Sequence, residues 1–283
     1  MSETALSERV EALLHSRYGV TLRDRQRRAV ARAIARRGAA TCAKDAEAYV
    51  QLLSDVPGEG EQLLRECLVG VTSLFRDRDV WTGLGDAVVP ALLRRFPGTL
   101  RALCVGVATG EEAWTLALVL QRLVVDGAQR DYAITATDVD PHRLRVARRG
   151  VYRIGAEDTV ADPLRPTVSD SGVRTRGDRL EFGPPLSEHV TFEQHDLLGP
   201  TLVPASAVLA SFPLVLLRNV LIYLDPPGRD HALARLARVL PEGGALVLGE
   251  AEHVPAALQS QLIPWRGLPP RSAIFMRVPA SHR

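Results

Sequence analysis

Short apolar runs alternate with helical patterns along the chain from about residue 85 onward. Six of these runs are predicted to be strands, at residues 100–105, 132–137, 190–193, 208–217, 245–248 and 273–278. Helical patterns at residues 115–125 and 229–240 lie between some of them. Because parallel strands need a crossover connection, this alternation predicts an α/β fold with a mostly parallel sheet.

The first eighty residues show apolar side chains at helical spacing and no strand pattern. The change of pattern divides the chain into a predicted helical domain, residues 1–85, and a predicted α/β domain, residues 86–283. Residues 153–188 of the second domain contain four prolines and little periodicity. We interpret them as a loop-rich insert or as a small antiparallel subdomain.

A predicted helix from about Thr21 to Gly38 carries a basic face. Its apolar stripe comprises Leu22, Val30, Ala33 and Ile34. Another flank carries arginines at spacings of three, four and four: Arg25, Arg28, Arg32 and Arg36. Between residues 17 and 44, nine basic residues accompany a single acid. This face is either a solvated helix surface or a docking surface for an acidic partner.

The overall composition points away from several other functions. The 35 basic and 33 acidic residues leave a net charge of +2, which does not indicate a nucleic-acid partner. The three cysteines lie far apart and the seven histidines lack metal-ligand spacing, so we expect no metal site. Acids stand where a signal peptide needs a basic start, and the most apolar stretch, residues 203–217, is too short to span a bilayer. We therefore expect a cytoplasmic protein without membrane insertion.

The first candidate binding motif is a turn between a predicted strand and a predicted helix. Gly106 and Gly110 allow the backbone to approach a ligand at the carboxyl edge of the sheet. The helix then begins with Glu111 and Glu112, which would repel a pyrophosphate. These acids either suit a cationic ligand, such as the amino and sulfonium groups of S-adenosylmethionine, or only stabilise the helix start.

Three further motifs follow other predicted strands. Asp138 ends the second strand, where an acid can accept hydrogen bonds from both ribose hydroxyls. His195-Asp196-Leu197 follows the third strand, in position to contact an adenine edge. The most apolar strand ends abruptly at Arg218 and Asn219, and Tyr223 follows four residues later. Because parallel strands end at the same edge of a sheet, we expect these residues to line one cleft.

Together these motifs resemble those of CheR, the family of chemotaxis-receptor glutamate methyltransferases. Five strings carry the resemblance: Thr72-Ser73-Leu74-Phe75-Arg76-Asp77, Thr109-Gly110-Glu111-Glu112, Thr137-Asp138-Val139-Asp140, Arg149-Gly150-Val151-Tyr152-Arg153 and Arg218-Asn219-Val220-Leu221-Ile222-Tyr223. The last string is the most specific. With the N-terminal helices and the final strand, the resemblance covers nearly the whole chain. The resemblance implies a bacterial protein with a class I, Rossmann-like methyltransferase fold, a doubly wound sheet preceded by a small helical domain.

The resemblance also implies a cofactor and its site. The cofactor would be S-adenosylmethionine, with S-adenosylhomocysteine as the product. The implied site residues are Thr72, Arg76, Glu112, Asp138, Asp196, Leu197, Arg218 and Asn219, to which the turn motif adds Gly106. Arg76 and Tyr223 would be catalytic, nearest the transferred methyl group. A glutamate acceptor has a pKa of about 4.3 and is already ionised at neutral pH, so Arg76 need only orient it and no general base is required.

The implied acceptor is a glutamate-bearing helix of a receptor, which the basic face can dock. Departures from the family pattern at Gly70, Leu74 and Pro213, and in the insert, leave two alternatives open. One is an enzyme of the same fold that methylates a small molecule or a peptide. The other is a catalytically inert module that binds S-adenosylmethionine or its demethylated product and signals through partner contact.

Overall fold

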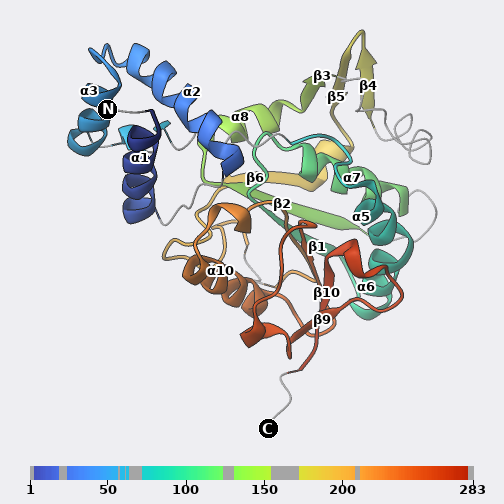
Figure 1. The fold of residues 1–283 in the computed structure, drawn as a ribbon. Coiled ribbons are helices and arrows are strands. Elements are labelled where there is room, and N and C mark those ends of the chain that lie inside the picture. Colours follow the sequence, from blue (N-terminus) through green and yellow to red (C-terminus); the bar gives the residue numbers. More distant parts are fainter. Residues whose placement is uncertain are drawn as a thin grey trace. The chain divides into compact units, whose positions relative to one another are not determined.

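The computed structural model describes residues 3–18, 24–56, 58–60, 62–63, 72–123, 131–153, 172–207 and 211–279. The chain separates into two compact units, residues 1–71 with 221–229 and residues 72–220 with 230–283. Each unit has its own hydrophobic core. Figure 1 traces the chain through both units.

The described helices of the first unit include α1 (Glu3–Tyr18), α2 (Asp24–Ala40) and α3 (Ala46–Asp55). Val30, Ala33 and Ile34 of α2 are buried, as the predicted apolar stripe requires. Leu22 and Thr21 lie outside the described residues. The first unit also holds a short 3-10 helix, η5 (Leu221–Tyr223), and the first turn of α10 (Pro226–Val239).

A buried carboxylate ties the segment after α3 to the helices of the first unit. Glu59 accepts hydrogen bonds from Arg37, with Nε–Oε1 and Nη2–Oε2 distances of 2.9 and 2.7 Å, and from the Tyr49 hydroxyl at 2.8 Å. Hydrogen bonds from Arg37 hold the pKa of Glu59 below its usual value. Burial raises the pKa of Tyr49, which keeps the hydroxyl protonated and donating.

The second unit is built around a seven-stranded sheet with the order β6-β2-β1-β7-β8-β10-β9. Its strands are β1 (Leu100–Val105), β2 (Tyr132–Asp138), β6 (Val190–Gln194), β7 (Leu214–Leu217), β8 (Ala245–Leu248), β9 (Leu262–Pro264) and β10 (Ile274–Arg277). β10 is antiparallel to both of its neighbours, and the other pairs are parallel. Every residue of β7 and β8 is buried, as in parallel strands covered on both faces. This confirms the predicted Rossmann-like α/β fold.

Helices flank this sheet in the way that crossover connections require. The helices α5 (Arg78–Gly83), α6 (Val89–Arg95), α7 (Glu111–Leu123) and α8 (Pro141–Arg149) belong to the second unit, and a π-helical turn, η1 (Leu84–Val88), joins α5 to α6. In Figure 1, α5, α6 and α7 lie on one side of the sheet, and α10 lies on the other. Short 3-10 helices complete the unit: η4 (Leu186–His189), η6 (Ala256–Leu258) and η7 (Pro270–Ser272).

One predicted strand is much shorter than expected. The apolar run at residues 208–217 forms a strand only over β7, residues 214–217, and residues 208–210 lie outside the described part. Pro213 explains the strand's start, because proline has no backbone N–H to donate to the neighbouring strand. Its carbonyl still accepts from the Ala245 N–H at 2.8 Å. The three-residue edge strand β9 was not predicted, since so short a run carries no periodicity.

The described part of the predicted insert contributes to a small antiparallel sheet. Its strands have the order β3-β5-β4, with β3 (Val151–Arg153), β4 (Val173–Arg176) and β5 (Arg179–Phe182). Phe182 stacks on Trp114 of α7 with ring centroids 5.2 Å apart, and it meets the Tyr152 ring edge-on at 5.7 Å. Aromatic contacts therefore fasten the small sheet to α7.

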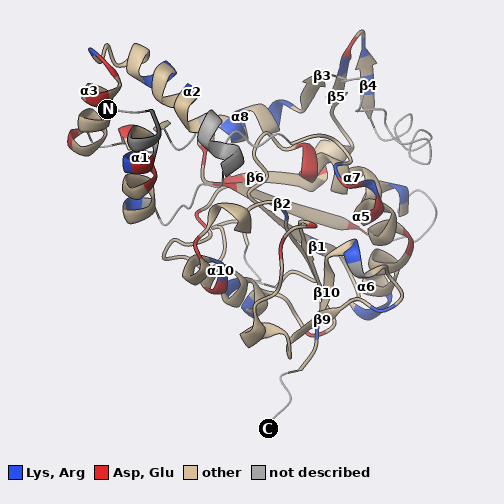
Figure 2. Cartoon of the chain, in the orientation of Figure 1, with Lys and Arg blue, Asp and Glu red and all other residues tan. Residues whose placement is uncertain are grey.

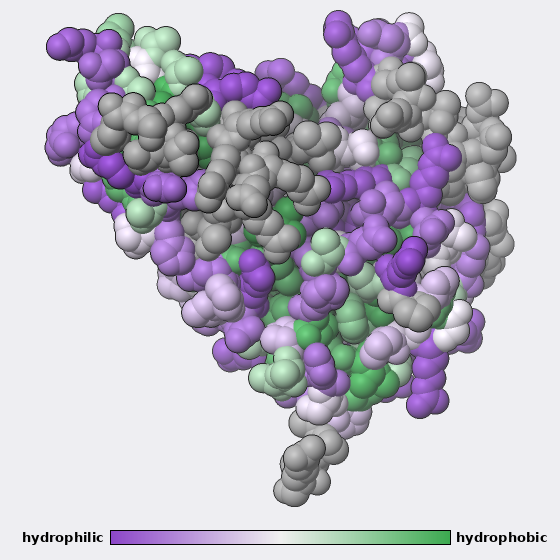
Figure 3. Space-filling view, in the orientation of Figure 1, coloured by the Kyte–Doolittle hydropathy of each residue, from purple (hydrophilic) through white to green (hydrophobic). Residues whose placement is uncertain are grey.

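The surface face drawn in Figure 3 is largely hydrophilic, with hydrophobic atoms gathered mainly in its lower half. Among the described residues, no helix combines the length and apolarity needed to cross a membrane.

Replacement of Glu59 by glutamine should make the chain's stability less dependent on acid pH. The folded-state pKa of Glu59 lies below that of the unfolded chain, so its stabilisation is present above the unfolded pKa and is lost as pH falls through the folded one. We expect the wild-type free energy of unfolding to drop below about pH 5, and Glu59→Gln to lose about 1–3 kcal/mol at neutral pH and to show a weaker acid dependence. Urea unfolding followed by circular dichroism at several pH values measures both effects.

The exposed Glu8 provides the control, because Glu8→Gln removes a carboxylate from α1 without touching this cluster. Equal acid dependence in wild type and Glu59→Gln would contradict the assigned role.

Candidate active site

Three of the predicted site residues stand at the carboxyl ends of adjacent parallel strands in the second unit. Gly106 comes directly after β1, Asp138 is the last residue of β2, and Arg218 comes directly after β7. Since β2, β1 and β7 are neighbours in the sheet and run parallel, these residues lie at one edge. The carboxyl edge of such a sheet is where open α/β folds bind ligands.

The turn after β1 is fixed to the end of β2. The Gly106 N–H donates to the Thr137 carbonyl at 2.7 Å, and the Ala108 N–H donates to Oδ2 of Asp138 at 2.8 Å. The other oxygen of Asp138 accepts from the Asp140 N–H at 2.9 Å. Burial raises the pKa of Asp138, and these two N–H groups oppose the shift.

Gly106 also has the conformation that its position predicts. Its φ is +72°, and a Cβ there would stand 2.5 Å from Cγ2 of Val220. A side chain at this position would therefore be strained and would clash with the segment after β7.

A second element of the site is the segment Phe75–Asp77, here called the arginine loop. Phe75 and Asp77 both have left-handed backbones, with φ of 55° and 58°. The Arg76 carbonyl accepts from Trp81 Nε1 at 2.8 Å and from Arg218 Nη2 at 3.0 Å. The Phe75 N–H donates to Oγ1 of Thr115, on α7, at 3.2 Å. Hydrogen bonds to other elements thus hold a loop whose backbone is locally strained.

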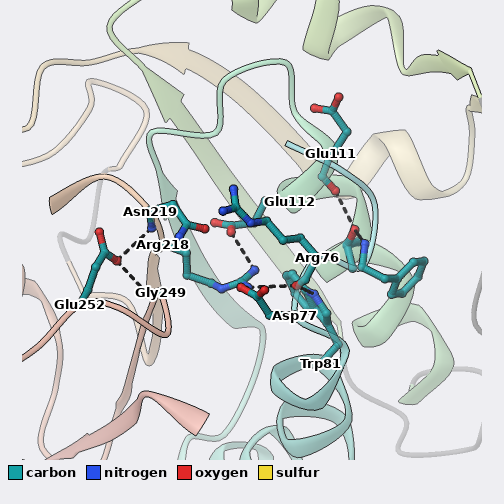
Figure 4. Close-up of polar contacts among 11 residues, drawn as sticks. Arg76, Asp77, Trp81, Glu111, Glu112, Arg218, Asn219, Gly249 and Glu252 are labelled. Carbon is teal, nitrogen blue, oxygen red and sulfur yellow. Dashed lines mark hydrogen bonds and ion pairs between the residues drawn. The ribbon is translucent and has the colours of Figure 1, made fainter. Parts of the chain in front are cut away.

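Arg218 lies at the centre of these contacts (Figure 4). Its side chain is only 1% exposed, and its Nη2 donates to Oδ2 of Asp77 at 2.7 Å. Its Nη1 donates to Oε2 of Glu112 at 3.1 Å, and its guanidinium carbon lies 5.1 Å from the centre of the Trp81 ring. Its buried Nε has no hydrogen-bond partner among the described residues. This donor is therefore left unsatisfied within the part of the chain that the structure describes.

Glu112, in the first turn of α7, is mostly buried. Burial raises its pKa, and the adjacent Arg218 opposes that shift. The Arg76 side chain, which is exposed, extends toward Glu112 in Figure 4 and also favours the ionised carboxylate. A buried acid between two arginines, with an open side, suits a ligand that carries both a cation and an anion, as the amino acid part of S-adenosylmethionine does.

Asn219 is the next residue after Arg218, and it also has a left-handed backbone, with φ of 60°. Its N–H donates to Oε2 of Glu252 at 2.9 Å. The same oxygen accepts from the Gly249 N–H at 2.7 Å. Glu252 is only 4% exposed. These contacts connect the segments that follow β7 and β8.

The structure brings most of the predicted site residues together. Arg218 contacts both Glu112 and the Arg76 carbonyl, and Asn219 is the next residue in the chain. Gly106 and Asp138 lie at the ends of the neighbouring strands β1 and β2, at the same edge of the sheet. The segment after β6 reaches the same edge, because the His195 N–H donates to the Asp138 carbonyl at 3.1 Å. In that segment Asp196 is exposed and Leu197 is buried. Thr72 is half-buried just before the arginine loop.

Tyr223 lies in η5, which belongs to the other compact unit. Its approach to the reacting atoms stays a prediction.

Four residues of this region were not among the predicted ones. Asp77 and Trp81 bind the arginine loop or Arg218, and Gly249 and Glu252 bind the segment of Asn219. A weak signal existed for the second pair, since a glycine and an acid three residues later directly follow a predicted strand. Trp81 gave no such signal, because a tryptophan at helical spacing is usual in a core, and it does pack there as well.

Comparison with known proteins identifies the family. The model of the CheR methyltransferase SAM-binding domain matches residues 70–265, which contain the contacts of the candidate active site. An uncharacterised 104.1 kDa protein of Rhodobacter capsulatus is 34% identical over 230 residues, which are 79% of this chain and 23% of that protein. A chemotaxis protein methyltransferase of Listeria monocytogenes is 32% identical over 186 residues, 66% of each chain. A probable chemotaxis protein methyltransferase of Rhizobium etli is 30% identical over 211 residues, 73% of this chain and 76% of that one.

The chain therefore spans about a quarter of the first relative and about two thirds of the second. The matched model is that of the domain that binds S-adenosylmethionine, and the donor set around Arg218 and Glu112 fits that cofactor. The chain belongs to the CheR methyltransferase family, of which it is a divergent member that binds S-adenosylmethionine.

Proposed function

We propose that this protein is an S-adenosylmethionine-dependent carboxyl O-methyltransferase that modifies glutamate side chains of a chemoreceptor-like protein. The observation that carries the proposal is the arginine loop, which presents an exposed Arg76 beside a buried Glu112 at the cofactor edge of a CheR domain. The names of the Listeria and Rhizobium relatives support the acceptor class.

The cofactor contacts follow from the charges at the site. When bound, S-adenosylmethionine supplies an electrophilic methyl group and leaves as S-adenosylhomocysteine. Glu112 would accept hydrogen bonds from the cofactor's ammonium group, and the positive charge of Arg218 would attract the cofactor's carboxylate. Asp138 accepts from ribose hydroxyls with the lone pairs that its two N–H donors leave free. Val139, which follows it and is 52% exposed, offers an apolar surface to the adenine. Thr72, Asp196 and Leu197 complete the proposed site.

The acceptor needs orientation more than activation. A glutamate side chain with a pKa of about 4.3 is already a nucleophilic carboxylate at neutral pH. Arg76 binds and aligns this carboxylate, and its fixed carbonyl limits the freedom of the loop from which the side chain extends. Tyr223 is proposed as a catalytic residue on the family resemblance alone. Alignment and exclusion of water are thus the main contributions of the protein.

The proposed partner is an acidic or glutamate-bearing helix, encountered in the cytoplasm. Its docking surface is the basic face of α2, formed by Arg25, Arg28, Arg32 and Arg36. Arg32 and Arg36 are exposed, and the side chains of Arg25 and Arg28 lie outside the described residues. Figure 2 marks the basic and acidic positions along the described chain. Positive charge on one helix steers an acidic partner toward the protein.

Methyl transfer should label glutamate esters on a receptor-sized protein. We would incubate the purified protein with methyl-labelled S-adenosylmethionine and bacterial lysate, separate proteins from small molecules, and measure methanol released from each fraction by mild base. The proposal expects base-labile label on a large protein, because carboxyl methyl esters hydrolyse readily in base. Arg76→Ala should reduce this label by at least about 100-fold if alignment by Arg76 supplies roughly 3 kcal/mol.

Two other outcomes of that assay would contradict the proposal and favour a different function. Label confined to small molecules or short peptides would assign metabolite or peptide methylation. Cofactor binding without transfer to any acceptor would assign a signalling module without catalytic activity.

Charge reversal on α2 should weaken the encounter with a protein acceptor. We expect Arg32→Glu with Arg36→Glu to raise the KM for the acceptor about tenfold at low ionic strength, with kcat and cofactor affinity nearly unchanged. The control carries the same change of charge at two exposed arginines of other helices, Arg94→Glu with Arg238→Glu. Similar KM values in both double variants would show that α2 is not the docking face.

An alanine at Gly106 should impair the cofactor site. Gly106→Ala combines left-handed strain of about 1 kcal/mol with a clash against Val220, whereas Gly98→Ala has similar strain (φ +83°) and no neighbour within 4 Å. We expect calorimetry to show a weaker affinity for S-adenosylmethionine in Gly106→Ala and an unchanged affinity in Gly98→Ala. The addition of Val220→Ala to Gly106→Ala should restore part of the affinity. No difference between the two glycine variants would contradict the assignment.

A further inference from the structure

Glu252 is a buried acid that the proposed chemistry does not use. Its side chain belongs to the turn that follows β8, and its residue is only 4% exposed. Burial of a carboxylate costs free energy unless hydrogen bonds compensate for the lost water. Both recorded donors to Oε2 are backbone N–H groups, one from Gly249 at 2.7 Å and one from Asn219 at 2.9 Å.

The contact with Gly249 closes the turn on itself. The Glu252 N–H donates to the Gly249 carbonyl at 2.9 Å, while the Glu252 carboxylate accepts from the Gly249 N–H. These reciprocal bonds fix where the carboxylate stands relative to the end of β8. Because β7 and β8 are paired in parallel from Leu214–Ala245 to Leu217–Leu248, the turn lies next to the segment that follows β7.

The contact with Asn219 acts on a strained residue. Asn219 has a left-handed backbone, a conformation that is uncommon for residues other than glycine, although asparagine tolerates it best. In this conformation its N–H points at the Glu252 carboxylate (Figure 4). The hydrogen bond to the Glu252 side chain therefore favours the conformation in which the Asn219 backbone is strained.

The close packing of the two segments leaves room for no side chain at position 249. A Cβ on Gly249 would stand 2.8 Å from Nδ2 and 2.9 Å from the backbone nitrogen of Asn219, and 2.9 Å from Oε2 of Glu252. The Asn219 side chain therefore lies directly over the Gly249 backbone. Its position depends on the same turn that carries Glu252.

We infer that Glu252 is a positioning residue that holds Asn219 in the conformation needed to contact S-adenosylmethionine. The inference rests on the proposed cofactor contact of Asn219. Glu252 itself touches the backbone of Asn219 and Gly249, and it acts on the cofactor through Asn219. The role differs from that of Glu112, whose carboxylate faces Arg218 and Arg76.

A double-mutant cycle on cofactor affinity tests this role. Calorimetry would give the Kd of S-adenosylmethionine for wild type, Asn219→Ala, Glu252→Met and the double variant. We expect each single variant to raise the Kd about tenfold. The double variant should bind no more weakly than the weaker of the two single variants, because both changes remove the contact of the Asn219 side chain with the cofactor. Glu252→Gln should keep most of the affinity, since one oxygen that accepts both N–H groups remains available.

The neighbouring Glu250 supplies a matched control, because it is exposed in the same turn and Glu250→Met should leave the Kd unchanged. Additive losses in the double variant, or an unchanged Kd in folded Glu252→Met, would overturn the inference. Thermal unfolding shows which variants are folded. If Glu252→Met does not fold, Glu252→Asp replaces it in the cycle, since the shorter side chain keeps the charge but cannot reach both N–H groups.

The measurement does not depend on the methyl acceptor. If the protein methylates no receptor, cofactor affinity still decides the role of Glu252. Conversely, an additive cycle leaves the proposed carboxyl methylation intact.

Discussion

The buried guanidinium of Arg218 is the interaction on which the site depends. It joins three segments that are far apart in the sequence: the arginine loop, the first turn of α7 and the end of β7. A buried arginine is stable only when its charge and its N–H groups are satisfied. Asp77, Glu112 and the face of Trp81 meet most of that requirement. The Nε donor of Arg218 has no partner among the described residues. The same residue thus organises the loops of the edge at which we propose that the cofactor binds.

Several residues of the site have backbones that ordinary side chains avoid. Phe75, Asp77, Ala108 and Asn219 all have positive φ, and all lie in loops at the carboxyl edge of the sheet. Each of them forms a hydrogen bond with a residue of another segment, namely Thr115, Arg218, Asp138 and Glu252 in turn. Strain held in this way fixes the direction of the side chains and carbonyls at the edge, which reduces the reorganisation needed when ligands bind. The stabilising contacts of the hydrophobic core, built on the sheet and on α7, provide the free energy that this strain requires.

Much of the fold could be predicted from the sequence. Short apolar runs identified six of the seven sheet strands. The signal was clearest for β7 and β8, because strands covered on both faces are apolar throughout. The run that ends at Leu217 was predicted too long, since hydrophobicity alone does not show that Pro213 cannot donate to the ladder. The division into residues 1–85 and 86–283 stays a prediction. Motif residues at strand ends were predictable as well, because parallel topology places all such ends at one edge.

The sequence by itself determined the chain's family, its parallel sheet and the residue types at the cofactor edge. Periodicity and short motifs are local properties, and they are legible without coordinates. Only the tertiary structure decided which partners those residues have. Arg218 meets Asp77, which is 141 residues away, and Glu252 meets Asn219, which is 33 residues away. Such contacts depend on how strand order and loop conformation bring distant segments together. Burial then strengthens each hydrogen bond, because the interior has a lower dielectric constant than water.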